Sequence, residues 1–439
     1  MKRFDVDAQT FRDLQIFGVE KRDKSVFSLF NQTSTLGGSE KLKLIFENPL
    51  VDAELLASRH ALFSYLLEHE IELNFDKEAV DFIEYFVNQR SSPKPFSKIG
   101  VVWEAINNFT GLTQESYNKL RGVHELLDLI KVIKAFCDDL QGEIPELLLA
   151  IKDAVLGLLK DVNIRSGIDT RPGILNISQL NRCNFTIRKS LLKEVKILLE
   201  LIYQLDASVA VVKAGKIYGL SYPILKTDTS HVLTIQGAFH LFLKDPVTND
   251  INFSQDQNVC FVTGVNMAGK STFLKSVAVC VYLAHLGLPV PAKHMEFSVL
   301  DGLITTINLP DSLNEGYSHF YTEVKRVKHV AEKVREAKSM LVIFDELFRG
   351  TNVKDAYDAS LSIIDSFAKI KSSFFMVSTH ITEVAKKLEK RENINFRFLE
   401  TKMIAGQPVF TYRLQKGITD ERLGLWIVEN EGIFRILNC

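Results

Sequence analysis

Residues 258–272, NVCFVTGVNMAGKST, decide the fold of the C-terminal half of this chain. The apolar run at 258–263 predicts a buried strand. Residues 264–271 fit the pattern GxxxxGK[ST] and lead into a helix predicted over Ser271–Leu286. A strand, a glycine-bearing turn and a helix in this order form a P-loop, in which backbone N–H groups and the helix N-terminus surround phosphate groups. The stretch therefore predicts a site for a nucleotide.

The predicted nucleotide contacts come from the loop itself. Lys270 is expected to reach the β- and γ-phosphates, and the Ser271 hydroxyl is expected to bind Mg²⁺. ATP and Mg²⁺ are thus the expected cofactors. The residues predicted to contact the nucleotide are Gly264, Val265, Asn266, Met267, Ala268, Gly269, Lys270, Ser271 and Thr272.

Polar residues end two further apolar strands. Asp345 and Glu346 follow the run at 340–344, where Asp345 can support Mg²⁺ through its water shell and Glu346 can polarise an attacking water. His380 follows the run at 374–378 and can donate a hydrogen bond to the γ-phosphate. The alternatives are a capped strand end for the two acids and a helix-capping or buried role for the histidine.

From about residue 216 onward, short β-rich runs alternate with helices. Continuously apolar strands fit a sheet that helices cover on both faces, which indicates an α/β domain. The predicted strands are Val232–Ile235, Asn258–Thr263, Gly302–Ile307, Met340–Phe344 and Phe374–Ser378, and the predicted helices are Ser271–Leu286, Thr322–Ala337, Asp355–Ile370 and Ile381–Arg391.

The N-terminal half is predicted to be mostly helical, because its apolar residues recur at spacings of three and four. Long helices with short connections favour an elongated helical domain, although a plain helix bundle would give the same periodicity. The predicted fold class is therefore α + α/β, with domains at 1–215 and 216–439. The predicted helices are Leu55–Glu68, Ala79–Asn88, Val123–Leu140, Pro145–Leu159 and Leu191–Leu205.

Composition narrows the possible partners. The 439 residues carry a formal net charge of −1, so affinity for DNA would need a local basic patch or an assembled dimer. The five cysteines show no zinc-binding spacing and fit free thiols in a reducing cytosol, which predicts a cytoplasmic protein. No signal peptide is expected at the N-terminus, and the longest apolar run, 277–290, is too short to span a bilayer.

Five segments of the C-terminal half resemble the MutS family of DNA mismatch repair ATPases. TGVNMAGKST at 263–272 is similar to the family's TGPNMxGKST, and DELFRGTN at 345–352 resembles DELGRGT. VTNDI at 247–251 is similar to a VPNDI segment on the adenine side, and SHFYTE at 318–323 resembles the STFxxE signature. LQKGITDERLGLWIVENEG at 414–432 follows the family's C-terminal run.

Motifs of the N-terminal half resemble the helical lever of the same family. Asp7 to Thr10 with Leu14 is similar to the start of the lever, and SLFNQTSTLG at 28–37 resembles SLLxxLDxTxTxMG. Leu205-Asp206 with Ala210 resembles the segment that closes the lever. The resemblance extends over about residues 5 to 435.

This resemblance implies an ABC-type arrangement in which two ATPase domains of a homodimer sandwich ATP. Ser318 would contact the γ-phosphate in trans, facing the other protomer's Lys270, although Ser318 also fits a helix N-cap before Thr322 and Glu323. Asn249 and Ile251 would lie beside the adenine. Closure would move the levers, and DNA and a mismatch-repair partner protein become the expected partners.

The chain departs from the family pattern at four positions. Val265 stands in place of a proline, Ala268 and Phe348 in place of glycines, and His319 in place of a threonine. No catalytic carboxylate or lysine is replaced. Measured against the family, the mismatch-reading and connector domains are expected to be absent and the clamp to be short or missing.

Two functions remain open on the sequence. The first is a Mg²⁺-dependent ATPase that acts on DNA in or near mismatch repair. The second is a DNA-structure or protein-interaction module that ATP switches and that has no mismatch specificity. An ABC transporter ATPase is disfavoured because no LSGGQ precedes Met340.

Overall fold

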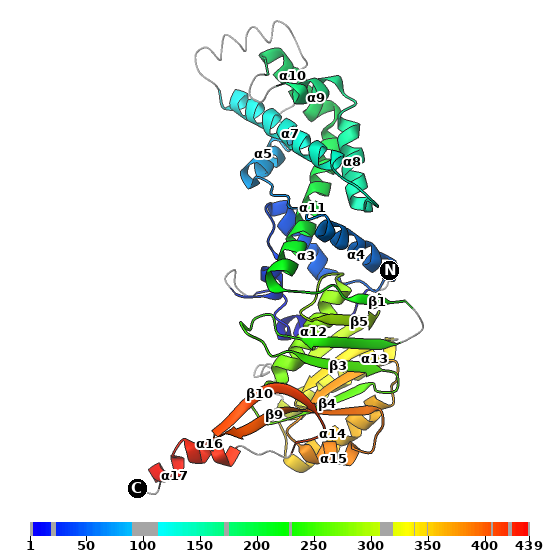
Figure 1. The fold of residues 1–439 in the computed structure, drawn as a ribbon, viewed down its shortest axis with the longest axis vertical. Helices are drawn as coiled ribbons and strands as arrows, with labels where there is room; N and C mark the ends of the chain where they lie inside the picture. Colours follow the sequence, from blue (N-terminus) through cyan, green and yellow to red (C-terminus); the bar gives the residue numbers. More distant parts are fainter. Residues whose placement is uncertain are drawn as a thin grey trace. The chain divides into compact units, whose positions relative to one another are not determined.

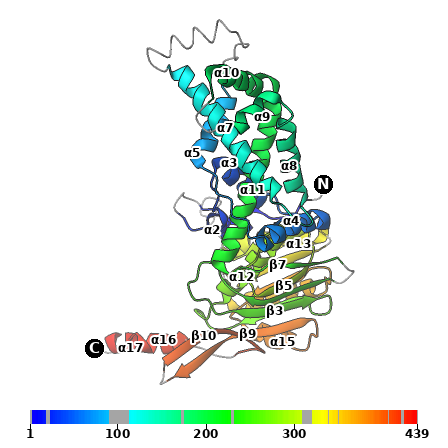
Figure 2. The same cartoon turned by 45° about the horizontal axis from the view of Figure 1, so that its top comes forward.

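The chain divides into two compact units in its computed structural model (Figures 1 and 2). The sheet unit comprises Met1–Leu29, Asn48–Ala57 and Gly215–Cys439, and the helical unit comprises Phe30–Glu47 and Ser58–Ala214. A helical region followed by an α/β region is confirmed, whereas the domain limits 1–215 and 216–439 stay a prediction. The structure describes residues 3–18, 23–89, 113–170, 175–227, 231–307, 319–337, 339–348, 350–404, 407–419 and 424–437.

The helical unit is built on the apolar faces of its helices. The contact between α5 and α7 is close, because a Cβ added to Gly122 would lie 2.3 Å from the ring of Phe86. The helices that lie wholly or mostly in this unit are α3 (Leu36–Glu47), α4 (Ala53–Glu68), α5 (Lys77–Val87), α7 (Gln114–Asp138), α8 (Glu146–Leu158), α9 (Val162–Asp169), α10 (Ile177–Phe185), the π-helical turn η1 (Thr186–Ser190) and α11 (Leu192–Tyr218).

Helix α11 runs well beyond the predicted end at Leu205. Its extension contains no proline and is mostly buried and apolar as far as Ala214, and it ends before Gly219, whose φ of 62° suits the left-handed residue that follows many helices. Within it, Asp206 accepts hydrogen bonds from the backbone N–H groups of Ser34 and Thr35 at 2.9 and 2.8 Å, and from the Thr35 hydroxyl at 2.7 Å. The segment at 28–37 and the segment that resembles the close of the MutS lever therefore meet in space.

A six-stranded sheet forms the centre of the sheet unit (Figure 1). Every residue of β4, β6, β7 and β8 is buried, so both faces of these parallel strands are covered, as their continuous apolar sequences predict. The hairpin of β9 and β10 is only half-buried, and its mixed polar sequence hid it from the sequence analysis. The order is β10 (Gln407–Lys416), β9 (Ile394–Ile404), β4 (Val259–Thr263), β8 (Phe374–Ser378), β7 (Met340–Asp345) and β6 (Gly302–Thr306).

A smaller sheet of four strands has the order β1 (Ile224–Lys226), β5 (His294–Ser298), β2 (Val232–Ala238) and β3 (Asn249–Ser254). Of these strands only β2 was predicted, as Val232–Ile235. The helices predicted around the larger sheet are confirmed with shifted ends. They are α12 (Lys270–His285), α13 (His319–Glu336), α14 (Val353–Ala368) and α15 (Thr382–Leu388), and the shorter helices of the chain are α1 (Ala8–Asp13), α2 (Val26–Phe30), α16 (Gly424–Asn430) and α17 (Ile433–Leu437).

The N-terminal segment closes the free edge of the larger sheet. Asp5 forms a parallel bridge with Gly302, through an N–H donated to Asp301 at 2.8 Å and a carbonyl that accepts from Leu303 at 2.9 Å. Beyond it, Arg326 of α13 donates to the carboxylate of Asp7. Burial alone would raise the pKa of Asp7, but the hydrogen bond and charge of Arg326 lower it below the ordinary value. The unpaired edge of β6 is thereby covered.

Two features bear on the class of protein. No helix within the described ranges is long and apolar enough to cross a membrane. The described cysteines, Cys137, Cys183, Cys260 and Cys280, are buried free thiols. Burial raises the pKa of Cys137 and of Cys183 to about 11.

Candidate nucleotide-binding site

The loop at 264–269 connects the end of β4 to the start of α12. Its backbone enters the left-handed region at Gly264, Met267 and Gly269, with φ of 142°, 74° and 96°. Glycine adopts such angles without strain, whereas Met267 holds one while its side chain is 72% exposed. The turn thus has the curled backbone that the P-loop pattern predicts.

Lys270 lies inside this loop. Its side chain is buried, and its ammonium group donates to the carbonyl oxygens of Gly264 at 2.8 Å and Val265 at 3.3 Å. A positive charge is therefore held within the turn, next to the N-terminal end of α12. This arrangement suits a polyphosphate, because the ammonium, the helix N-terminus and the loop N–H groups all favour negative charge.

Asp345 joins the loop to two neighbouring strands. It ends β7 and is 6% exposed, and its two carboxylate oxygens accept hydrogen bonds from the hydroxyls of Ser271 and Ser378. Because β7 and β8 are parallel and adjacent, Asp345 and Ser378 lie opposite each other at the same edge of the sheet. Ser378 was not among the residues predicted for the site, although its position at the end of a buried strand and two residues before His380 was a usable signal.

The Ser271 and Asp345 oxygens fit a Mg²⁺ site. Mg²⁺ prefers hard oxygen ligands, keeps several waters, and is usually bound by one or two carboxylates together with the phosphates of its substrate. The structure brings one hydroxyl and one carboxylate into direct contact beside the buried Lys270. These two residues would hold the ion, Ser271 directly and Asp345 through water, as the sequence analysis proposed.

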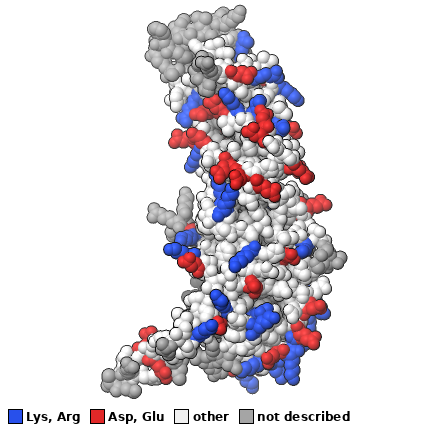
Figure 3. Space-filling view, in the orientation of Figure 1, with Lys and Arg blue, Asp and Glu red and all other residues white. Residues whose placement is uncertain are grey.

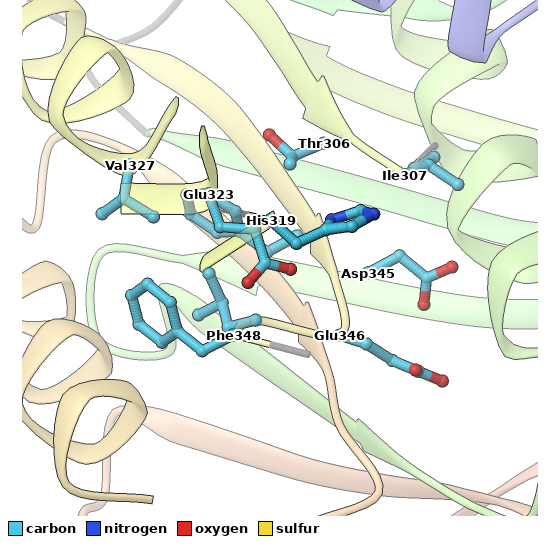
Figure 4. Close-up of a pocket in the computed structure, with 10 residues that line it drawn as sticks. Thr306, Ile307, His319, Glu323, Val327, Asp345, Glu346 and Phe348 are labelled. Carbon is cyan, nitrogen blue, oxygen red and sulfur yellow. The ribbon is translucent and has the colours of Figure 1, made fainter. Parts of the chain in front are cut away.

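Glu346 follows Asp345 and lies on the same side of the turn (Figure 4). Its backbone has a φ of 60°, and its N–H donates to the Ser378 carbonyl at 3.0 Å. Its carboxylate is 15% exposed and lies 3.6 Å from Nδ1 of His380, whose own side chain is 58% exposed. The structure thus brings Glu346 and His380 together beside Asp345, and leaves the histidine open to solvent.

A cavity of about 420 Å³ lies beside the loop. Met267, Gly269 and Thr272 line it, together with Asn249 and Tyr412. This volume is within the usual range for small-molecule sites and would admit the base of a nucleotide. Tyr412 was missed by the sequence analysis, because it reaches the cavity from β10, far from the loop in sequence.

Of the two residues predicted to lie beside the adenine, Asn249 lines the cavity and Ile251 does not. Asn249 lines the cavity, but its amide also holds β10: its Nδ2 donates to the Tyr412 carbonyl at 2.9 Å, and its Oδ1 accepts from the Leu414 N–H at 2.7 Å. Ile251 is buried within the smaller sheet opposite Ile235, and it is not among the residues that line the cavity.

A second and smaller pocket, of about 70 Å³, is lined in part by Asp345 and Glu346 (Figure 4). His319 and Glu323 of α13 line it, together with Thr306 of β6 and the turn at 346–348. Ser318, the predicted contact in trans, lies outside the described residues. The first turn of α13 is thus placed directly against the turn that carries Glu346.

Comparison with known sequences agrees with this geometry. Residues 260–436 match the family described as MutS domain V. These residues form a MutS domain V. MutS domain V is an ABC-type ATPase domain, and the matched segment contains every predicted loop and acidic residue of the site from Gly264 to His380. The predicted family and enzyme class are confirmed for this domain.

Relatives of the domain are DNA mismatch repair proteins named MutS. The protein from Ehrlichia ruminantium (strain Gardel) is 31% identical over 218 residues, which is 49% of this chain and 27% of that protein. The protein from Anaplasma phagocytophilum (strain HZ) is 33% identical over 183 residues, which is 42% of this chain and 22% of that protein. The aligned part thus spans about a quarter of these relatives, and the lever resemblance of the N-terminal half stays a prediction.

Proposed function

We propose that this chain is a Mg²⁺-dependent ATPase that acts on DNA, in or near mismatch repair. The observation that carries the proposal is the convergence of Lys270, Ser271 and Asp345 at one edge of the sheet, inside a MutS domain V. We also propose that two copies sandwich ATP and that closure moves the helical levers. This arrangement would couple a local change of charge to a large movement.

Each residue has a defined part in the proposed reaction. Lys270 and the loop N–H groups bind the β- and γ-phosphates, and Ser271 and Asp345 would hold Mg²⁺, which would supply neutralisation of charge on the phosphates. Glu346 polarises a water that attacks the γ-phosphorus as the bond to the β,γ-bridging oxygen breaks. His380 lies close enough to Glu346 to orient its carboxylate, and it can donate a hydrogen bond to the γ-phosphate.

The proposed homodimer predicts that ATP turnover per chain falls on dilution. Each site would need Ser318 from the partner, so sites become incomplete when dimers dissociate. Steady-state phosphate release at saturating ATP, measured over a wide range of protein concentration, tests this expectation. A turnover per chain that stays constant over the whole range would remove the role of Ser318 in trans.

Action on DNA is supported by the printed names of the relatives, which are mismatch repair proteins. The net charge of −1 gives no general affinity for DNA, and Figure 3 shows basic and acidic side chains interspersed over most of the face in view. Any DNA contact would therefore depend on a local surface or on the assembled dimer.

The test is DNA binding at low salt, with and without ATP, to a mismatched duplex, a matched duplex and a branched DNA. We expect ATP-dependent binding with a higher affinity for at least one of these forms. Equal affinity for all three would instead favour a nucleotide-switched module without mismatch specificity. No binding at low salt would contradict both DNA functions, because phosphate contacts are strongest there.

A further inference from the structure

The turn after Asp345 contains an unusual residue. Phe348 has a φ of 61°, in the left-handed region that an aromatic side chain disfavours, and it stands where the MutS pattern has a glycine. Glu346, two residues earlier in the same turn, has a φ of 60°. The turn that carries Glu346 thus keeps a left-handed backbone at position 348, although the residue there is a phenylalanine and not a glycine.

Burial of the Phe348 ring offsets this strain. The side chain is only 4% exposed and belongs to the apolar core between α13 and the sheet, together with Val327 and Phe344. Its ring lies 5.6 Å from that of Phe320, at an interplanar angle of 60°, which is a favourable edge-to-face arrangement. Turning the backbone of Phe348 out of the left-handed region would remove the ring from this core.

Two further contacts hold the same turn against α13. A Cβ added to Gly350 would lie 2.6 Å from the backbone nitrogen of Phe320 and 2.8 Å from Cβ of His319, so the two backbones approach as closely as glycine allows. The N–H of Gly350 also points to the Glu323 carboxylate at 3.4 Å. His319 and Phe348, two of the departures from the family pattern, therefore lie at the same contact.

The turn is consequently held at both ends. The Glu346 N–H is bound to Ser378 of β8, while Phe348 is fixed against α13. Figure 4 shows the two side chains leaving the turn in opposite directions, with Phe348 toward Glu323 and Val327, and Glu346 toward the side of Asp345. A movement of the Phe348 ring would therefore change the direction of the Glu346 carboxylate.

We propose that Phe348 is a positioning residue for hydrolysis: its contact with Phe320 fixes the turn on α13 and so holds Glu346 in its catalytic position. This inference rests on the proposed ATPase activity. It also predicts that the glycine of the family pattern does not replace Phe348 in this chain, because the ring, and not backbone freedom, keeps the turn in place.

The test separates ATP binding from turnover in Phe348→Gly, Phe348→Ala and Phe320→Ala. We expect kcat to fall at least tenfold in each, with the dissociation constant for ATP changed less than twofold, because Lys270 and the loop are untouched. Phe348→Leu, which keeps an apolar side chain in the core, should recover part of kcat. In the double variant that combines Phe348→Ala with Phe320→Ala, kcat should be no lower than in the less active of the two single variants, because both substitutions remove the same contact.

Phe367→Leu is the matched control. Phe367 is equally buried in the same core and stacks on Phe375 at 4.9 Å, but it does not belong to the turn. It should lower the thermal midpoint and leave kcat within twofold. If Phe348→Gly does not fold, Phe348→Leu and Phe320→Leu replace it in the same assay. Each should then lower kcat more than the control Phe367→Leu does.

Two outcomes would overturn the inference: a folded Phe348→Gly with kcat within twofold of wild type, or losses at Phe348 and Phe320 that multiply in the double variant. Failure of the underlying function would look different. In that case the wild type would hydrolyse no ATP, or Glu346→Gln would leave its hydrolysis unchanged. Substitutions at position 348 would not alter either result.

Discussion

Replacing Glu346 with glutamine should lower kcat for ATP hydrolysis by about 10²- to 10⁴-fold, the range for loss of a positioned general base. Glutamine keeps the size of the side chain and the backbone contact to Ser378, but it carries no charge to polarise the attacking water. Binding of ATP should persist, because the loop and Lys270 are unchanged. Steady-state phosphate release and the affinity for ATP, measured on the same preparation, test both parts.

Two variants make this result interpretable. Lys270→Ala should abolish nucleotide binding itself, since it removes the ammonium held inside the loop. Glu389→Gln makes the same chemical change on an exposed glutamate beyond α15 and should leave both quantities unaltered. Equal hydrolysis by Glu346→Gln and wild type would show that another group activates the water.

The part of the site that could be predicted from sequence is the part built by local geometry. A strand, a glycine-bearing turn and a helix place Lys270 and Ser271 within one short segment, so their spacing alone specifies their relation. Asp345 could be added because parallel buried strands bring their ends to one edge of the sheet. The continuous apolar sequences of β4, β7 and β8 made those strands recognisable.

The remaining parts of the site depend on contacts between segments that are distant in sequence. Tyr412 faces the loop only because the half-buried hairpin of β9 and β10 pairs with β4 and is held by Asn249, which lies 163 positions away in sequence. The role of Phe348 likewise depends on its distance from Phe320, which no periodicity predicts. Left-handed backbone at a phenylalanine contradicts local preference, and only the tertiary core explains it.

Asp13→Ala should lower the free energy of unfolding by about 3–5 kcal/mol. Asp13 ends α1, is 1% exposed and accepts hydrogen bonds from the Thr305 hydroxyl at 2.7 Å, the Ile307 N–H at 3.0 Å and the Gln9 amide at 2.8 Å. Alanine would leave these donors without their acceptor, and buried donors that lose a partner cost about 1–3 kcal/mol each. Denaturant unfolding of the full chain measures the loss.

The controls separate this network from a general effect of removing charge. Asp358→Ala removes an exposed carboxylate from α14 and should change the free energy of unfolding by less than about 0.5 kcal/mol. Combining Asp13→Ala with Thr305→Val should cost less than the sum of the two, because removing both partners of a hydrogen bond leaves fewer unsatisfied groups. A loss below about 1 kcal/mol for Asp13→Ala would mean that the hydrogen bonds of Asp13 contribute little to the contact between α1 and β6. The six-stranded sheet would then be stable without the hydrogen bonds that join α1 to β6.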